Sequence, residues 1–250
     1  MADSGAGTGP GRRVAMQIQP AQPGAGAGPA YVAFLRHGAY RQRADAPSAR
    51  QPFPLTEEGL AQARAGADRL AAMLAARGLV PAPVIHSSCQ LRAWQTAEAV
   101  RLRLGAQVRT LRQTSALAER GLGSAANLTV AEIEAVLAAD PRHPAPPPGW
   151  KSDRDYRLPL EGAESLAEAG ARVAAHLQAT LQSGRVVVHV GHGAAFRHAC
   201  CHLGLLAPER IAALSMYHAE PLLFCYQPHG SWRHLAGQWK VRAPKEEPID

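Results

Sequence analysis

Two apolar segments of the sequence each end at a histidine, and the neighbouring residues suit an anionic substrate. YVAFL runs directly into Arg36 and His37, and VVVHV reaches His192 through a glycine. Adjacent side chains of a strand point to opposite faces, so Arg36 and His37 can share a target only where the backbone bends. Glycines beside both histidines allow such a bend. One histidine at a strand end is usually structural, but this matched pair favours catalysis at one edge of a sheet.

Three further residues could take part in the same chemistry. Ser88 or Ser87 is expected to cap a helix that follows it, and Arg92 falls in the first turn of that helix. Free backbone N–H groups and the helix dipole also stabilise an anion there. Glu119 lies in a glycine-containing loop and could act as general acid and base. Arg120 could hold the substrate or pair with Glu119. The simpler alternatives are a solvated surface arginine at Arg92 and a surface ion pair between Glu119 and Arg120.

Strands that alternate with helices must position these residues. The predicted strands are 31–35, 83–88, 107–111 and 185–190, followed by β-rich pieces at 212–217, 221–227 and 231–238. The predicted helices are 57–77, 90–104, 129–139, 162–182 and one that begins after Gly193. This alternation predicts an α/β three-layer sandwich with a mostly parallel central sheet covered by helices on both faces. In such sheets ligands bind outside the carboxyl ends of the strands.

Composition predicts one catalytic domain over 30–240, preceded by a disordered leader. Residues 1–29 are rich in glycine, alanine and proline without a sustained period, and 241–250 form a predicted flexible tail. A transit peptide is the less favoured interpretation of the leader. No apolar run approaches the roughly 20 residues of a membrane span. The four cysteines lack C-x-x-C spacing, so buried free thiols in a reducing compartment, and hence a cytoplasmic protein, are expected.

The charge of the chain points to an anionic substrate. The net charge is +7 and the pI near 9.7, and only three of the basic residues are lysines. Arginine matches phosphate or carboxylate bidentately. A nucleic-acid partner is disfavoured because the arginines are scattered and aromatic residues are few. The acidic residues do not cluster in the sequence as metal ligands do, so neither a metal nor another cofactor is expected. The oligomeric state stays open, with a homo-oligomer as the alternative to a monomer.

The motifs LRHG, SSCQLRAWQTAE, LAERGLG and VGHG, in this order, resemble the histidine phosphatase superfamily in its phosphoglycerate mutase-like branch. The resemblance extends from residue 31 to about 225. It implies a nucleophile at His37 and a proton donor at Glu119. It also implies a phosphate pocket that comprises Arg36, Arg92, His192 and Gly193, with Arg120 close to the substrate.

The expected function is a metal-independent phosphomonoester hydrolase with a phosphohistidine intermediate. Gly193 stands where the acid phosphatase branch of the family carries an aspartate, so Glu119 must supply the proton. The mutases typically follow R-H-G with an acidic or small polar residue and a nearby asparagine, whereas Ala39, Tyr40 and Arg41 follow here. Hydrolysis is therefore favoured over mutase-type phosphotransfer. A non-catalytic scaffold that binds phospho-ligands is the third alternative, and the substrate could be a small molecule or a protein.

Five other residues have expected positions. His189 is expected to be a hydrogen-bonded core histidine, and Trp94 is expected to pack in the core. Arg197 and His198 open the helix after His192, near the expected pocket, and either residue could touch substrate. His218 could approach the pocket, but a satisfied loop residue is the favoured interpretation.

Overall fold

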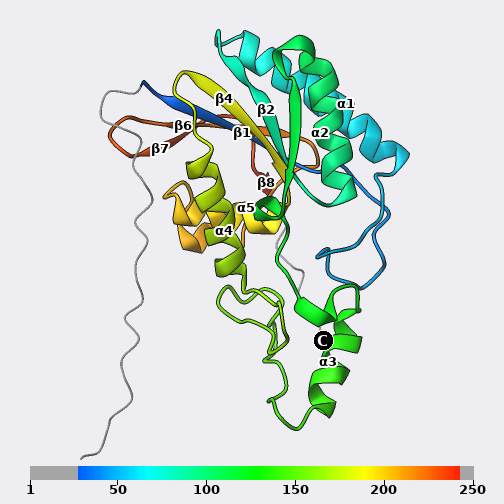
Figure 1. Ribbon diagram of the computed structural model, residues 1–250. Helices are drawn as coiled ribbons and strands as arrows, with labels where there is room; N and C mark the ends of the chain where they lie inside the picture. Colours follow the sequence, from blue (N-terminus) through cyan, green and yellow to red (C-terminus); the bar gives the residue numbers. More distant parts are fainter. Residues whose placement is uncertain (1–27, 243–250) are drawn as a thin grey trace, which may run out of the picture.

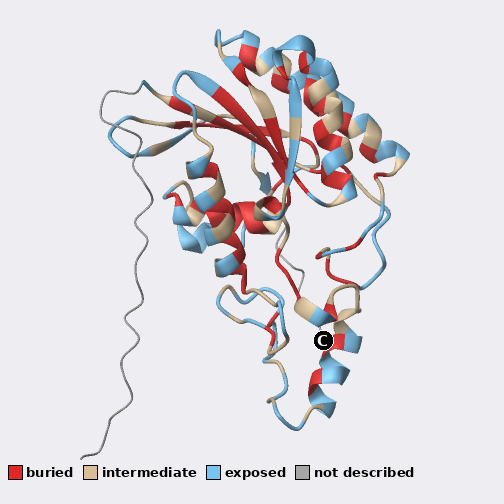
Figure 2. Cartoon of the chain, viewed as in Figure 1, coloured by how far each residue is buried: buried red, intermediate tan, exposed pale blue. Residues whose placement is uncertain are grey.

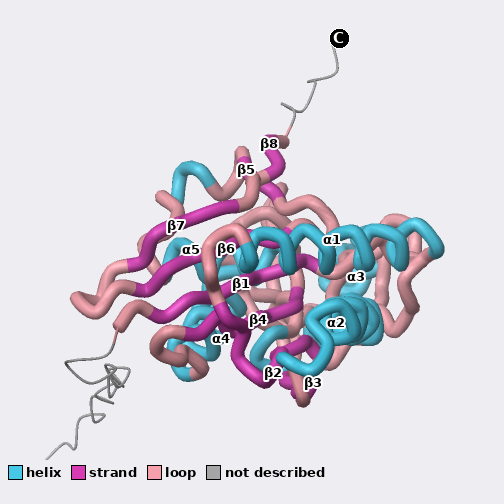
Figure 3. Tube along the Cα trace, turned by 90° about the horizontal axis from the view of Figure 1, so that it is seen from above, coloured by secondary structure: helices cyan, strands magenta, loops and turns pink. Residues whose placement is uncertain are grey.

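A six-stranded sheet forms the centre of the protein (Figure 1). The computed structural model describes residues 28–242. The strand order is β3-β2-β4-β1-β6-β7, and Figure 3 shows the strands side by side in that order. The strands of this sheet are β1 (Ala30–Arg36), β2 (Val80–Ser88), β3 (Thr110–Thr114), β4 (Arg185–Gly191), β6 (Pro221–Tyr226) and β7 (Trp232–Ala236). The first four run parallel, while β6 and β7 are antiparallel to their neighbours. The predicted mostly parallel sheet is confirmed.

Two pairs of helices cover the two faces of the sheet. The helices are α1 (Glu57–Ala75), α2 (Leu91–Leu104), α4 (Leu166–Ala179) and α5 (Gly193–His202). Successive residues of β1 face opposite layers: Leu35 joins the core under α1 and α2, whereas Phe34 joins the core under α4 and α5. Phe34 stacks on Phe196 of α5 with ring centroids 3.6 Å apart. These two cores give the three-layer arrangement predicted from the sequence.

A third, smaller core lies beyond the carboxyl edge of the sheet. Helix α3 (Val130–Ala139) begins with a capping box formed by Thr129 and Glu132. Its buried residues Ile133 and Leu137 pack with Trp150 from the loop that follows. Figure 2 shows buried residues concentrated in the central strands and on the inner faces of the helices, with a smaller buried group in this region. We call residues 118–163 the cap.

Some predicted element boundaries differ from the structure. Strand β3 begins at Thr110 because a 3-10 turn, η1 (Gly105–Gln107), takes up the start of the predicted strand. The predicted strand at 212–217 shortens to β5 (Leu214–Ser215), which pairs with β8 (Lys240–Val241) outside the main sheet. Val241 therefore belongs to a strand, although the sequence placed it in the tail.

Two side-chain predictions are wrong and one is only partly right. Trp94 is 36% exposed, because it borders an open groove between α1 and α2 instead of packing in the core. Helix α2 begins at Leu91 with Gln90 as N-cap, so the predicted serine cap is also wrong, since the Ser88 side chain bonds to other groups. All four cysteines are free thiols, but Cys89 is exposed and Cys201 only half-buried.

Almost all of the predicted leader lies outside the described residues, as does most of the predicted tail. Strand β1 begins at Ala30, the first residue of the predicted domain. Within residues 28–242, no helix is long and apolar enough to cross a membrane.

Candidate active site

Neighbouring parallel strands bring the two matched histidines together. Arg36 and Gly191 are register partners at the carboxyl ends of β1 and β4. The residues that follow these two strands, His37 and His192, therefore lie at the same edge of the sheet. The backbone N–H of His37 donates to the Gly191 carbonyl at 3.0 Å. The two rings lie 5.0 Å apart between centroids, and both residues are about 1% exposed. The predicted meeting of the two histidines at the sheet edge is thus what the structure shows.

Close backbone packing explains the glycines of both motifs. A Cβ added to Gly38 would collide with the carbonyl of Gly59 in the first turn of α1. The N–H of Gly38 also donates to the Thr96 hydroxyl of α2 at 3.1 Å. A Cβ on Gly193 would lie 3.2 Å from Cδ of Arg36. The glycines therefore let the chain turn tightly after His37 and let Arg36 lie against the start of α5.

The His37 ring is held in the form that a nucleophile needs. Nδ1 lies 2.7 Å from the Gly38 carbonyl, and because a carbonyl only accepts, Nδ1 carries the hydrogen and Nε2 keeps its lone pair. Burial lowers the pKa of His37 well below its ordinary range, and the positive charges of Arg92 and Arg36 lower it further. His37 is therefore neutral near pH 7, with Nε2 available for attack.

Arg92 is fully buried, so the alternative of a surface arginine is excluded. Its Nη1 donates to the Gln51 carbonyl at 2.8 Å, and its Nη2 donates to the carbonyls of Ser48 at 2.7 Å and Ala49 at 3.2 Å. The Tyr40 ring covers the guanidinium at 4.4 Å. Nε is buried and has no hydrogen-bond partner among the described residues. The segment 46–51 thus closes the site over Arg92.

A short chain of hydrogen bonds fixes His192. Arg92 Nη2 lies 3.3 Å from Nδ1 of His192, which must accept because the guanidinium only donates. The other ring nitrogen, Nε2, then donates to the Ser88 hydroxyl at 2.9 Å, and Ser88 donates to the Gln90 side chain at 2.8 Å. Burial and the Arg92 charge lower the pKa of His192, so this ring is neutral too. Its role in orienting His192 makes Ser88 a site residue that the sequence suggested only as a helix cap.

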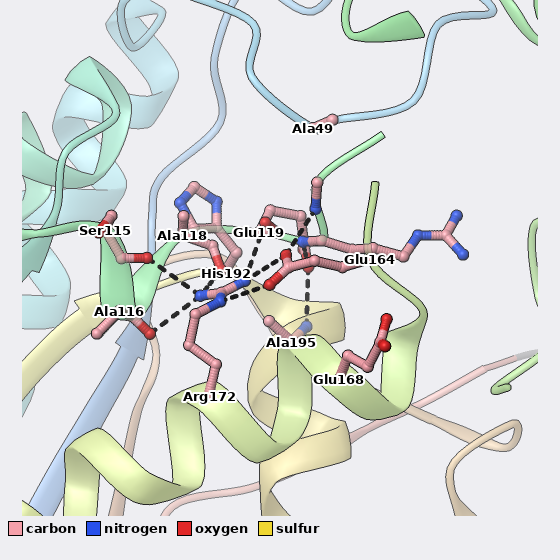
Figure 4. Close-up of polar contacts among 12 residues, drawn as sticks. Ala49, Ser115, Ala116, Ala118, Glu119, Glu164, Glu168, Arg172, His192 and Ala195 are labelled. Carbon is pink, nitrogen blue, oxygen red and sulfur yellow. Dashed lines mark hydrogen bonds and ion pairs between the residues drawn. The ribbon is translucent and has the colours of Figure 1, made fainter. Parts of the chain in front are cut away.

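Glu119 reaches the same edge from the cap. Its carboxylate accepts from the backbone N–H groups of Ala194 at 3.2 Å and Ala195 at 2.8 Å, at the N-terminus of α5 (Figure 4). Its negative charge raises the pKa of Arg36 and of Arg92, partly opposing the effect of burial. Glu119 is therefore close enough to both guanidinium groups to share a substrate with them.

A clamp that the sequence did not reveal holds the loop of Glu119. Arg172 of α4 binds the Glu164 carboxylate through two nitrogens, at 2.8 and 2.7 Å (Figure 4). It also donates to the carbonyls of Ser115, Ala116 and Ala118, each at 3.1 Å. Glu164 in turn accepts from the N–H of Gly121 at 3.0 Å. No short motif marks this pair, because its two members act through the backbone of a distant loop.

Three other residues that the sequence singled out, Arg120, Arg197 and His198, are all buried. Arg120 is 7% exposed, its guanidinium lies 5.8 Å from the Trp150 ring, and within residues 28–242 no ion pair joins it to Glu119. Arg197 donates to the carbonyls of Ile211 and Leu214 and so supports the fold rather than the pocket. His198 is 4% exposed, and burial lowers its pKa to about 4.

Two histidines have clear outcomes. His189 is fully buried and hydrogen-bonded to Thr180 at 2.9 Å, so its prediction as a core histidine is confirmed. His218 lies beside the nucleophile, 5.8 Å from His37 between ring centroids. His218 does lie in a turn, but the structure supports the less favoured interpretation, that this side chain approaches the pocket.

The comparisons with known proteins agree with this geometry. The model of the histidine phosphatase superfamily (branch 1) matches residues 32–236. The chain therefore belongs to the histidine phosphatase superfamily.

Individual relatives include a mutase and several phosphatases. A 2,3-bisphosphoglycerate-dependent phosphoglycerate mutase of Brucella anthropi is 30% identical over 175 residues, covering 68% of this chain and 79% of the relative. A mycobacterial glucosyl-3-phosphoglycerate phosphatase, solved with VO3, is 28% identical with a TM-score of 0.59, covering 82% of this chain and 96% of that chain. A phosphoserine phosphatase of Entamoeba histolytica, 17% identical with a TM-score of 0.56 and covering 83% and 95% of the two chains, shares the fold. The expectation of a phosphatase of the histidine phosphatase type is confirmed, with mutase-type phosphotransfer as its alternative.

Proposed function

We propose that the protein hydrolyses phosphomonoesters without a metal, through a phosphohistidine at His37. The observation that carries this proposal is the state of the His37 ring. The ring is neutral, its Nδ1 is hydrogen-bonded to the Gly38 carbonyl, and two guanidinium groups lie beside it. In the first step Nε2 attacks phosphorus and the ester P–O bond breaks, while Glu119, which takes up a proton with the substrate, gives that proton to the departing oxygen. In the second step water attacks phosphorus and loses a proton to Glu119. The N–P bond then breaks, releasing inorganic phosphate and restoring neutral His37.

The arginines stabilise the transition state of both steps. The phosphoryl oxygens carry negative charge in a loose transition state, so positioned positive charge supplies much of the rate acceleration. We assign Arg36 and Arg92 to these oxygens, together with the helix start at Gly193. We also assign His192, whose Nε2–H would exchange the Ser88 hydroxyl for a phosphoryl oxygen. The unpartnered Nε of Arg92 is a buried donor that a phosphoryl oxygen can satisfy.

Substrate entry requires a rearrangement of the segment 46–51. The carbonyls of Ser48, Ala49 and Gln51 hold the terminal nitrogens of Arg92, and a phosphoryl group must compete with them. The carbonyl contacts also hold the guanidinium in place before substrate arrives, which limits the reorganisation during reaction. We propose that this segment acts as a lid over the phosphate pocket.

The substrate class that suits the site is a small phosphomonoester that carries a second anionic or polar group. Arg120 is buried on the cap side, next to Glu119, and suits that role. The phosphoglycerate in the names of two relatives also favours a small anionic substrate over a phosphoprotein. We further propose a cytoplasmic protein without a nucleic-acid or membrane partner, with residues 30–240 as its single catalytic domain.

The test of the proposal is hydrolysis of p-nitrophenyl phosphate with and without EDTA. Wild-type protein should release phosphate equally in both conditions, and His37→Ala should be inactive. Activity that EDTA abolishes, or undiminished activity of His37→Ala, would overturn the mechanism.

Mutase activity is the second candidate, favoured by the match to the Brucella anthropi mutase. Ala39 and Tyr40 follow R-H-G here, where the mutases typically carry an acidic or small polar residue with an asparagine nearby, and the Tyr40 ring covers Arg92. We therefore expect phosphate to pass to water. Interconversion of phosphoglycerates at a rate equal to or above that of phosphate release would favour the mutase instead.

A further inference from the structure

We propose that His218 is a positioning residue of the active site, which holds the ring of the nucleophile His37 in its attacking orientation. This inference rests on the proposed function of His37. The four motifs that predicted the site do not include His218, which comes from the turn between β5 and β6.

Ring packing around His37 supports this role. The His218 ring is inclined by only 30° to the His37 ring at a centroid distance of 5.8 Å, a stacked arrangement. Tyr40 meets the same ring edge-on at 5.3 Å, inclined by 85°. The hydrogen bond from Nδ1 to the Gly38 carbonyl fixes one point of the imidazole. The stacked ring of His218 then limits rotation about the remaining axis, so that Nε2 keeps its direction.

The backbone next to His218 is built to hold that position. Ala219 is fully buried and adopts a left-handed conformation with φ of 54°. This conformation is strained for an alanine and persists only where the surroundings impose it. The N–H of Ala219 donates to the Arg36 carbonyl at 2.8 Å, and its carbonyl packs against Gly66, where a Cβ would collide. The turn is thus fastened to β1, one residue before the nucleophile, and to α1.

The charge state of His218 suits a packing role. Burial lowers its pKa to about 4, and the positive charges of Arg36 and Lys240 contribute. Near pH 7 the ring is therefore neutral and adds no positive charge beside His37. His218 also forms part of the wall of a polar cavity of about 420 Å³ that includes Arg36, Lys240 and the ion pair of Arg69 with Glu220. Loss of the ring would connect this cavity to the nucleophile and admit water.

Three substitutions separate ring packing from hydrogen bonding. His218→Phe keeps a flat ring without a polar atom, His218→Asn keeps a donor without the ring, and His218→Ala removes both. Because small misplacements of a reacting group lower rates steeply, we expect His218→Ala and His218→Asn to lose about 10-fold or more in kcat. His218→Phe should stay within about 3-fold of wild type, and KM for p-nitrophenyl phosphate should change little in all three variants.

A second measurement keeps the test independent of folding. The ¹⁵N chemical shifts of His37 report which ring nitrogen carries the hydrogen. Wild type and His218→Phe should show hydrogen on Nδ1, whereas His218→Ala should show a mixture of the two tautomers. Unchanged kcat and an unchanged tautomer in His218→Ala would overturn the inference, as would rescue by asparagine but not by phenylalanine. Either result with an active wild type and an inactive His37→Ala leaves the proposed function intact, whereas a wild type without turnover overturns both.

Discussion

The protein has two groups of three histidines, and the surroundings of the two groups differ. The edge group is His37, His192 and His218. The interior group is His86 of β2, its register partner His189 of β4, and His176 of α4, with ring centroids 5.0 to 5.7 Å apart. Burial lowers the pKa of the histidines in both groups, so burial by itself does not distinguish a catalytic histidine.

The difference lies in what surrounds each group. The buried guanidinium of Arg92, the half-buried one of Arg36 and the start of α5 border the edge group, and both Nδ1 of His37 and Nδ1 of His192 have partners. In the interior group each histidine keeps a buried nitrogen without a hydrogen-bond partner among residues 28–242. Over the same residues no group of three His, Cys, Asp or Glu side chains is arranged to hold a metal ion. The edge group can bind and attack an anion, whereas the interior group has the features of core packing.

Replacement of the nucleophile should have the largest effect on activity. His37→Ala removes the proposed nucleophile, so we expect kcat to fall by about 1,000-fold or more while the thermal midpoint changes little. The matched control in the interior group is His86→Ala, which should keep kcat within about 3-fold. An equal loss of activity in both variants, measured by phosphate release, would erase the contrast between the groups.

Replacement of Arg92, which carries the buried positive charge, should have the second-largest effect on activity. Arg92→Ala should lower kcat/KM by about 100- to 1,000-fold, because transition-state charge loses a positioned partner. Arg92→Lys should recover little, since an ammonium cannot reproduce the bidentate fork. Arg103→Ala, on an exposed ion pair of the same helix, is the control and should behave as wild type. Full rescue by lysine would contradict this account, because it would show that a positive charge stabilises the transition state without the guanidinium geometry.

Loss of the proton donor should depend on the leaving group. Glu119→Gln should lower kcat about 100-fold for an alkyl phosphate, whose departing oxygen needs a proton, and much less for p-nitrophenyl phosphate. Glu132→Gln, on the exposed surface of the cap, provides the control. A uniform loss across both substrates would assign Glu119 to structure instead of proton transfer.

The interior group should set the acid stability and leave turnover unchanged. Burial and nearby positive charge lower the pKa of His86 to about 4, below the value of about 6.5 expected in the unfolded chain. The unfolded state therefore binds more protons between these values, so this contribution to stability is complete above pH 6.5 and is lost as the pH falls toward 4. The loss is on the order of 2 kcal/mol. His86→Gln should flatten the urea-unfolding free energy over this range, and a profile parallel to wild type would contradict the assignment.

Sequence patterns could predict the sheet and the pairing of His37 with His192 because local signals determine both. Apolar strands, glycine-flanked histidines and a helix after Ser88 each act within a few residues along the chain. The resemblance of the motifs to a known family then supplied the roles of Arg92 and Glu119.

The remaining features depend on contacts between distant segments. The stack of His218 on His37 joins the turn before β6 to the residue that follows β1, and the clamp of Arg172 acts on backbone carbonyls about 55 residues earlier in the chain. The exposure of Trp94 was mispredicted for the same reason, since helical spacing alone does not show that α1 leaves a groove beside it. No periodicity in the sequence encodes such tertiary neighbours.

The most direct test of the account is to trap the covalent intermediate. Wild-type protein is mixed with a ³²P-labelled phosphomonoester in EDTA, quenched in alkali within milliseconds, and the labelled peptide is sequenced. The account predicts an acid-labile, base-stable phosphoryl group on His37 that is absent from His37→Ala. A label on another residue, or turnover without any labelled histidine, would contradict it.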